Sequence, residues 1–293
     1  MSSGAKDIRR GLLLTAALLA AIACDAEAQG SLNKPDYVAS ADGVRIAYEV
    51  HGAGSPSLVF VHGWSCNRTY WSGQLGEFAK RNTVVAIDLA GHGDSGIDRK
   101  NWTIPAYGAD VAAVVKKLNL KKVVLIGHSM GGDVIAEAAL LLPGRVAGLI
   151  WVDTYKKLGA GRSPEEVDAF AAKFSPDFAK TTQEFVRSMF VSTSDPALVE
   201  RVAHQMSSAP PNIAIPSLRA AFGYSREMPA TLERLMLPGI AINPDNGPTD
   251  VAALKHYGFD VMIMPGVGHF EMMEDPARFN ELLNTAIAKL TTP

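Results

Sequence analysis

The chain has 293 residues, and its 28 lysine and arginine residues almost balance 30 aspartate and glutamate residues, for a formal net charge of −2 at pH 7. Because it contains no basic tract, the sequence gives no support to a protein that binds nucleic acid or an anionic membrane surface. Hydrophobic residues make up 47% of the chain, and its length is that of one globular domain or slightly more.

The first 28 residues are typical of a secretory signal peptide. Lys6, Arg9 and Arg10 precede an apolar run over residues 12–23, and small residues follow it. The run is short for a bilayer span, whereas a positive start followed by an apolar stretch is the pattern of a signal peptide. Small residues at 26 and 28 predict cleavage before Gln29, which would give a periplasmic or secreted bacterial protein.

A second processing site competes with this one. Residues 21–24 resemble a bacterial lipobox, and cleavage there would leave a lipid on Cys24 and anchor the protein to a membrane. Only one other cysteine, Cys66, is present. Removal or lipidation of Cys24 leaves Cys66 without a partner, so we expect no disulfide bond.

Strands and helices alternate along most of the mature chain. Apolar, β-branched runs predict strands, and amphipathic segments between them predict helices. In chain order we expect a hairpin at 37–50, a strand at 57–61, a helix at 69–80, a strand at 83–88, a helix at 105–118, a strand at 123–128, a helix at 133–142 and a strand at 146–152. Later in the chain we expect a strand at 238–243, a helix at 249–256, a strand at 259–264 and a helix at 276–290. This alternation predicts an α/β fold, with a mostly parallel central sheet and helices on both faces.

The alternation stops between residues 155 and 237. This segment lacks strand-like runs, and its helical segments carry many phenylalanine and methionine residues. We therefore predict a helical cap inserted at residues 155–237 into a core made of residues 29–154 and 238–293. Aromatic residues of the cap would form its own core, and some would line an apolar substrate pocket.

The stretch Gly127-His128-Ser129-Met130-Gly131 joins a buried strand directly to a helix. So sharp a corner leaves little room, which explains glycine two residues before and two residues after it, and it holds Ser129 in a strained backbone conformation. Such a corner lifts the serine hydroxyl clear of the sheet and points the first helical N–H groups at whatever the hydroxyl attacks. The pattern predicts a nucleophilic serine.

Polar residues follow several predicted strands. His62, Ser129, Asp153, Asp245 and His269 each come after one. Ligand and catalytic sites of parallel sheets lie at the carboxyl ends of the strands. We therefore expect these residues to border a single site.

Four motifs occur in a characteristic order along the chain: His62-Gly63-Trp64, the segment 88–95 (DLAGHGDS), the segment 127–132 (GHSMGG) and the segment 266–269 (GVGH). Together they resemble the α/β-hydrolase fold superfamily over nearly the whole chain after the signal. The resemblance implies a Ser–acid–His triad and an oxyanion hole. It leaves the substrate open.

Serine needs a base near neutral pH, and histidine supplies one. We expect His269 to be that base, because it follows the last strand in a glycine-containing loop. Family resemblance and the geometry of the corner assign the oxyanion hole to the backbone N–H groups of Trp64 and Met130. The other histidines have simpler structural explanations, and none is spaced as in a metal site. We expect no metal and no cofactor.

Four aspartates compete for the role of the acid that orients His269. Asp260 precedes its strand, and Asp250 falls in the first turn of a helix, where the helix dipole already favours an acid. Asp153 follows the strand next to the serine strand, and some relatives use that position. Asp245 follows the strand before the one that leads to His269, where most of the family has its acid, so we predict Asp245 and keep Asp153 as the alternative.

These residues predict a serine hydrolase that cleaves carboxylic esters of small or apolar substrates through an acyl-enzyme. The same triad can hydrolyse lactones, thioesters, amides or carbon–carbon bonds. Relatives on this fold also include cofactor-free perhydrolases and lyases, and some members only bind ligands. A small-molecule substrate is the expected partner, with membrane attachment only if Cys24 is lipidated; the sequence does not specify an oligomeric state.

Overall fold

The structure is a computed structural model that describes residues 34–159 and 161–292. The predicted signal peptide and both of its competing processing sites lie outside the described residues. Within the described residues, no helix is both long and apolar enough to traverse a bilayer.

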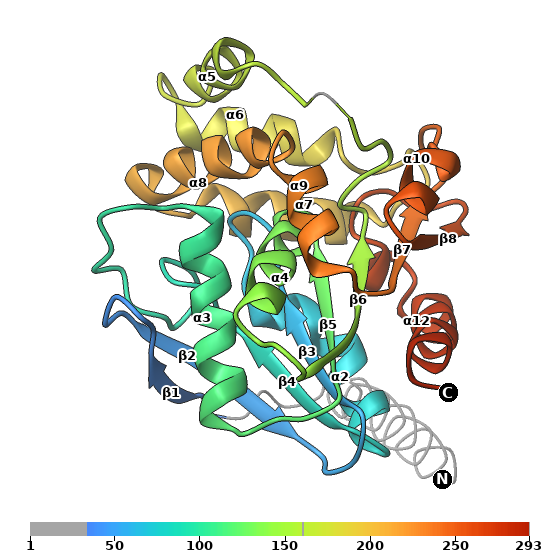
Figure 1. Cartoon of the computed structure of the whole chain (residues 1–293). Helices are drawn as coiled ribbons and strands as arrows, with labels where there is room; N and C mark the ends of the chain where they lie inside the picture. The colour runs from blue at the N-terminus through green and yellow to red at the C-terminus, as the bar shows by residue number, and fades with distance from the viewer. Residues whose placement is uncertain (1–33, 160, 293) are drawn as a thin grey trace, which may run out of the picture.

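Eight strands form one sheet in the described part of the chain, in the order β1-β2-β4-β3-β5-β6-β7-β8 (Figure 1). Strand β2 runs antiparallel to β1 and to β4, and all other neighbouring pairs are parallel. The strands are β1 (Asp36–Ala39), β2 (Arg45–His51), β3 (Ser57–Val61), β4 (Thr83–Ile87), β5 (Val123–His128), β6 (Val146–Val152), β7 (Gly239–Pro244) and β8 (Phe259–Met264). The mostly parallel sheet predicted from the sequence is confirmed.

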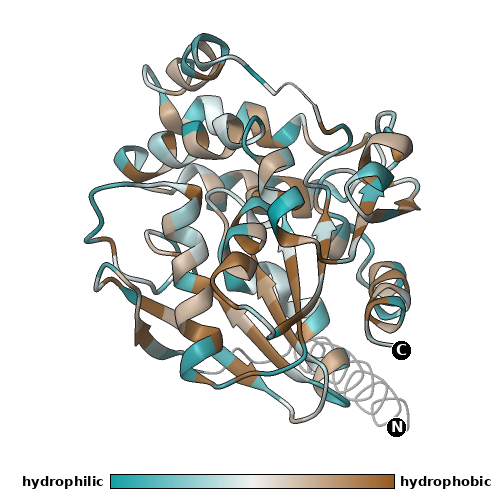
Figure 2. Cartoon of the chain, in the orientation of Figure 1, coloured by the Kyte–Doolittle hydropathy of each residue, from teal (hydrophilic) through white to brown (hydrophobic). Residues whose placement is uncertain are grey.

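The central strands are hydrophobic along their whole length because both faces of the sheet are covered. Every residue of β3, β5 and β7 is buried, and Figure 2 shows brown, hydrophobic strands running through the middle of the molecule. Helices α3 (Ile104–Lys117) and α4 (Met130–Leu140) pack together on one face, and α2 (Ser72–Ala79) and α12 (Pro276–Thr291) pack together on the other.

Several predicted elements differ from the structure only at their ends. The helix expected at 69–80 begins as a 3-10 turn, η1 (Arg68–Trp71), before α2. The helix expected at 249–256 is α10 (Val251–His256), and the side chain of Asp250 caps it by accepting the Ala253 N–H. This capping bond accounts for an acid at that position.

Helices and no strands occupy the described residues between β6 and β7. They are α5 (Pro164–Ala172), α6 (Phe178–Arg187), α7 (Pro196–Ser207), α8 (Pro211–Tyr224) and α9 (Met228–Leu235). Figure 1 shows this group above the carboxyl ends of β5 and β6. We call these helices the cap; the domain boundaries drawn from the sequence remain a prediction.

Candidate active site

Ser129 lies between β5 and α4 in the strained backbone conformation expected from the sequence. Its φ is 54° and its ψ is −122°, values that non-glycine residues rarely adopt. The Ser129 N–H donates to the Val152 carbonyl of β6 at 2.9 Å. This bond anchors the corner to the neighbouring strand.

The two glycines that flank Ser129 are required by close packing. A Cβ atom at Gly127 would lie 2.3 Å from the Gly131 carbonyl oxygen, and a Cβ at Gly131 would lie 2.5 Å from the Val61 carbonyl oxygen. Real Cβ atoms do not approach backbone so closely. The corner can therefore form only with glycine at both positions, as the sequence argument requires.

His269 is hydrogen-bonded to Asp153 and not to Asp245. The distance from His269 Nδ1 to Asp153 Oδ2 is 2.6 Å. Burial opposes ionisation of Asp153, but the hydrogen bond and charge of His269, together with Lys156, hold the pKa of its carboxyl below the usual value. The carboxylate therefore fixes a proton on Nδ1. In the described part of the chain no hydrogen bond occupies Nε2, which is left for a proton from another group.

The prediction that Asp245 pairs with His269 is wrong. Asp245 is exposed, and its Oδ1 accepts the Gly266 N–H at 2.9 Å. The sheet order gives the reason, because β6 lies directly beside β5, whereas β7 is one strand further from Ser129. The backbone at Asp153, with φ 42°, turns the chain sharply where β6 ends, and the alternative acid therefore reaches the histidine.

The loop that carries His269 is held on three sides. The His269 N–H donates to the Met189 carbonyl of the cap segment at 2.9 Å, and His128 Nε2 donates to the His269 carbonyl at 2.8 Å. Burial lowers the pKa of His128 to about 3, so its ring is neutral. Glu274 accepts the N–H groups of Gly268 and Phe270. Glu274 was not predicted from the sequence. Its only signal there is that an acid follows shortly after a glycine-rich loop.

The two N–H groups assigned to the oxyanion hole belong to residues that line the same cavity as Ser129. Met130 is the first residue of α4, so its N–H has no partner inside the helix. Trp64 lies in the loop after β3, and its indole N–H donates to the Ala214 carbonyl of α8 at 2.7 Å. Its side chain thus ties this loop to the cap.

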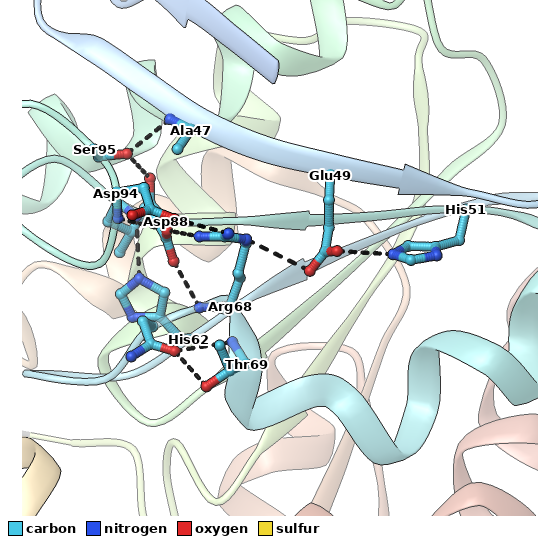
Figure 3. Close-up of polar contacts among 11 residues, drawn as sticks. Ala47, Glu49, His51, His62, Arg68, Thr69, Asp88, Asp94 and Ser95 are labelled. Atoms are coloured by element: carbon cyan, nitrogen blue, oxygen red, sulfur yellow. Dashed lines mark hydrogen bonds and ion pairs between the residues drawn. The ribbon is translucent and has the colours of Figure 1, made fainter. Parts of the chain in front are cut away.

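An ion cluster centred on Arg68 joins the start of η1, which follows the Trp64 loop, to carboxylates of β2 and of the segment after β4 (Figure 3). The Arg68 guanidinium pairs with Asp88, with Asp94 at 2.8 Å and with Glu49 of β2 at 3.5 Å. The Arg68 backbone N–H also donates to Asp88 Oδ1 at 2.7 Å. Because Asp88 directly follows β4, the cluster fastens the start of η1 to the sheet.

Two buried histidines beside this cluster bind backbone, as the sequence argument expects. His62 Nε2 accepts the Leu89 N–H at 3.0 Å, so its Nδ1 donates to the Gly63 carbonyl at 2.8 Å. His92 Nε2 accepts the Ser65 N–H at 3.3 Å. Burial lowers the pKa of both rings, that of His92 to about 4. Both are therefore neutral and brace the Trp64 loop.

Ser129 and His269 line one cavity of about 370 Å³ beneath the cap. Part of its wall is apolar, formed by Phe185, Met189, Met206, Leu218 and Phe222. Polar residues also reach it, among them Asp133. Asp133 was not assigned from the sequence, where its signal was an acid in the first turn of a mostly apolar helix.

Cys66 and three further histidines have structural explanations. Cys66 is buried, burial raises the pKa of its thiol, and it donates to the Trp64 carbonyl, which fits a packing role. His204 and His256 are exposed, and His51 is half-buried beside Glu49. Among the described residues, no group of three or more acidic, histidine or cysteine side chains could hold a metal ion.

Comparison with known proteins places the chain in a well-populated group. A family model described as an alpha/beta hydrolase family matches residues 58–282. A pimeloyl-[acyl-carrier protein] methyl ester esterase of Yersinia enterocolitica is 26% identical over 260 residues, which cover 82% of this chain and 96% of the relative. An uncharacterized protein of Mycobacterium tuberculosis is 29% identical over 265 residues, covering 82% of this chain and 77% of the relative.

Solved structures share the fold over most of the chain. Est816, described as an N-acyl homoserine lactone degrading enzyme, superimposes with a TM-score of 0.72 and 28% sequence identity. The superposition covers 85% of this chain and 99% of Est816.

Proposed function

Because the chain belongs to the alpha/beta hydrolase family, and is therefore a hydrolase, we propose that it cleaves carboxylic esters of small molecules by forming an acyl-enzyme on Ser129. The observation that carries the proposal is the hydrogen bond of 2.6 Å between His269 and Asp153 at the edge of the cavity that Ser129 lines. A serine, a histidine and a buried carboxylate in this arrangement are the groups that nucleophilic catalysis needs.

In the first half of the reaction, Ser129 Oγ attacks the ester carbonyl carbon while its proton passes to His269 Nε2. The carbonyl oxygen becomes an oxyanion and accepts hydrogen bonds from the N–H groups of Trp64 and Met130. When the carbon–oxygen bond to the alcohol breaks, His269 returns the proton to the leaving alkoxide. The alcohol departs and the acyl group stays on Ser129.

In the second half, water takes the place of the alcohol. Water gives a proton to His269 Nε2 as its oxygen attacks the acyl carbon, and the same N–H groups receive the new oxyanion. Collapse of this intermediate breaks the bond to Ser129 Oγ, which regains the proton from the histidine. Throughout, Asp153 accepts the Nδ1–H and stabilises the imidazolium that forms twice per cycle.

Two relatives support the substrate class. The Yersinia relative is named for a methyl ester, and Est816 for a lactone, which is a cyclic ester. A methyl ester and a lactone each contain an ester carbonyl that a serine nucleophile can attack. A cavity of about 370 Å³ suits a small substrate, and its partly apolar wall suits one with an alkyl portion.

The test combines labelling with a substrate panel. A fluorophosphonate probe should label the wild-type protein and Ser225→Ala, a change to another serine of the same cavity, but not Ser129→Ala. Ser129→Ala should lose roughly 10⁶ in kcat. The panel holds p-nitrophenyl esters of rising chain length, a homoserine lactone and an anilide. Equal labelling of Ser129→Ala, or turnover of the anilide alone, would overturn the proposal. A preference for the lactone would keep the proposal and identify cyclic esters as the substrates.

A further inference from the structure

A buried carboxyl group that the mechanism does not use faces the same cavity as Ser129. Asp133 lies four residues after the nucleophile on α4 and is only 4% exposed. Residues four apart share one face of a helix and lie about 6 Å apart along its axis, and Ser129 is the residue that directly precedes α4. Ser129 and Asp133 accordingly both line the cavity.

Only one oxygen of Asp133 is used by the protein. Its Oδ1 accepts the Tyr155 hydroxyl at 2.7 Å, and within the described chain Oδ2 has no hydrogen bond. Burial, opposed in part by the Tyr155 hydrogen bond, raises the pKa of Asp133 to about 8. The carboxyl is therefore mostly protonated at neutral pH. Because Oδ1 already receives a proton from Tyr155, the proton of the acid sits on Oδ2 and is an unused donor.

Among the described residues, Oδ2 of Asp133 is not one of the fully buried side-chain oxygens that lack a partner. It is therefore open to the cavity, where a polar atom of the substrate can accept its hydrogen bond. We propose that Asp133 is a specificity-determining residue that donates a hydrogen bond to a second oxygen of the substrate. This inference rests on the proposed ester hydrolysis. The substrate class is an ester with a carbonyl or ether oxygen about one helical turn from the scissile carbonyl, which corresponds to the fourth or fifth atom along its acyl or alcohol chain.

Several titratable groups surround this donor. Tyr155, on the loop after β6, is its direct partner, and Tyr224 of α8 is hydrogen-bonded to Glu137 of the same helix as Asp133. Burial, with the charge of Asp133 as a further cause, raises the pKa of Tyr155, so that it stays a donor through neutral pH. The other titratable residues that line the cavity are Cys66, His128, Lys157, Arg162 and His269.

Two matched pairs of esters test the proposal. In methyl 4-oxopentanoate and methyl pentanoate the extra oxygen is in the acyl part, and in 2-methoxyethyl acetate and butyl acetate it is in the alcohol part. The readout is the ratio of kcat/KM within a pair, measured by acid release. Both members of a pair depend equally on Ser129 and His269, so any pH dependence of the shared chemistry and any general loss of activity cancel from the ratio.

We expect wild type to favour the oxygen-containing member of one pair about ten-fold more than Asp133→Leu does at pH 6.5, since one hydrogen bond is worth up to about that factor. The pair that responds identifies the acyl or the alcohol side. In wild type the preference should fall as pH rises from 6.5 to 9.5 and Asp133 loses its proton. Asp133→Asn retains an acceptor for Tyr155 and an N–H donor that does not titrate, so its preference should persist at both pH values.

Equal ratios in wild type and Asp133→Leu for both pairs would overturn the proposal while leaving ester hydrolysis intact. A preference that rises with pH would also overturn it, because an ionised Asp133 would then be the binding form. If Asp133→Leu does not fold, the contrast between the pH-dependent wild type and the pH-independent Asp133→Asn decides the question. Turnover of p-nitrophenyl esters or of the lactone but of none of these four esters would overturn this inference alone. Absence of turnover of all of these substrates would overturn the proposed function and, with it, this inference.

Discussion

The carboxylate of Asp153 determines which nitrogen of His269 carries a proton, and it is the residue for which a substitution is most informative. Asp153→Asn keeps the shape of the side chain but can donate to Nδ1, which would leave the proton on Nε2 and prevent it from accepting one from Ser129. We expect a loss of about 10⁴ in kcat on a p-nitrophenyl ester.

Asp245→Asn is the matched control for this change. Its carboxylate accepts a backbone N–H in an exposed loop, so its substitution should leave most of the activity. The assignment of the acid would be reversed if Asp245→Asn lost four orders of magnitude and Asp153→Asn stayed active.

His92 links protonation to the stability of the Trp64 loop. Its pKa is about 4 in the folded protein, because burial disfavours the charged ring, against about 6.5 in an unfolded chain. The unfolded state therefore binds the extra proton between these values. His92 contributes stability that is fully present above pH 6.5 and is lost as pH falls toward 4, by about 1.4 kcal/mol per pH unit.

Urea unfolding of wild type and His92→Gln at pH 7, 6, 5 and 4.5 isolates this contribution. Buried groups remote from His92 titrate alike in both proteins and cancel from the difference. His62 is the exception, because its ring centroid lies 5.0 Å from that of His92 and His92 helps to lower its pKa, so part of its effect stays in the difference. We expect wild type to be more stable at pH 7 and the difference in unfolding free energy to shrink as the pH falls. A difference that is constant over this range would show that His92 titrates normally in the folded state.

At the level of elements, the connection from β3 to α2 depends on Arg68. Its side chain is nearly fully buried and pairs with carboxylates that follow or belong to two other strands. Removal of the Arg68 side chain leaves the buried carboxylate of Asp88 without an opposite charge, and breaking a buried ion pair in this way costs about 3–5 kcal/mol. Arg68→Met should therefore lower the free energy of unfolding by roughly that amount, measured by urea titration.

Arg68→Lys separates charge from geometry in the same experiment. Lysine keeps the charge but cannot reach three carboxylates with one planar group, so we expect an intermediate loss. A loss below about 1 kcal/mol for Arg68→Met would mean that the cluster does not hold η1 against the sheet.

The elements themselves were predictable because their signals are local. Strands β3 and β5 are short apolar runs that end at glycine-containing corners, and the sheet buries both completely. The corner at Ser129 was predictable for the same reason, since steric exclusion at Gly127 and Gly131 acts within five residues. The 3-10 start of α2 was not predicted, because it depends on the side chain of Asn67, which caps η1.

Which acid binds His269 is not a local property of the sequence. Asp153 and Asp245 both follow strands, and the amino-acid sequence places each at the same edge of the sheet. The choice between them depends on the positive φ at Asp153 and on the hydrogen bond from Gly266 that holds Asp245 in its own loop. Neither is visible in hydrophobic periodicity, so the family preference selected the wrong candidate.

At the level of the whole molecule, the site is assembled from both the core and the cap. His269 belongs to the core, yet its N–H is bound by the Met189 carbonyl, and Trp64 donates its indole N–H to Ala214 of α8. The cap thus contacts the loop of the proposed base and the loop of one proposed oxyanion donor. Displacement of the cap would change the cavity wall and both loops together.

Export and processing involve the N-terminal segment, where two cleavage sites compete. We propose that the protein is exported and begins at Gln29, since an apolar run led by positive residues is a signal for secretion. Intact-mass analysis of the protein from a bacterial host checks this, with Cys24→Ser as control. Cleavage before Gln29 removes position 24, so wild type and Cys24→Ser should have identical mature masses. A wild-type mass that includes a lipid, lost in Cys24→Ser, would instead establish a membrane-anchored lipoprotein.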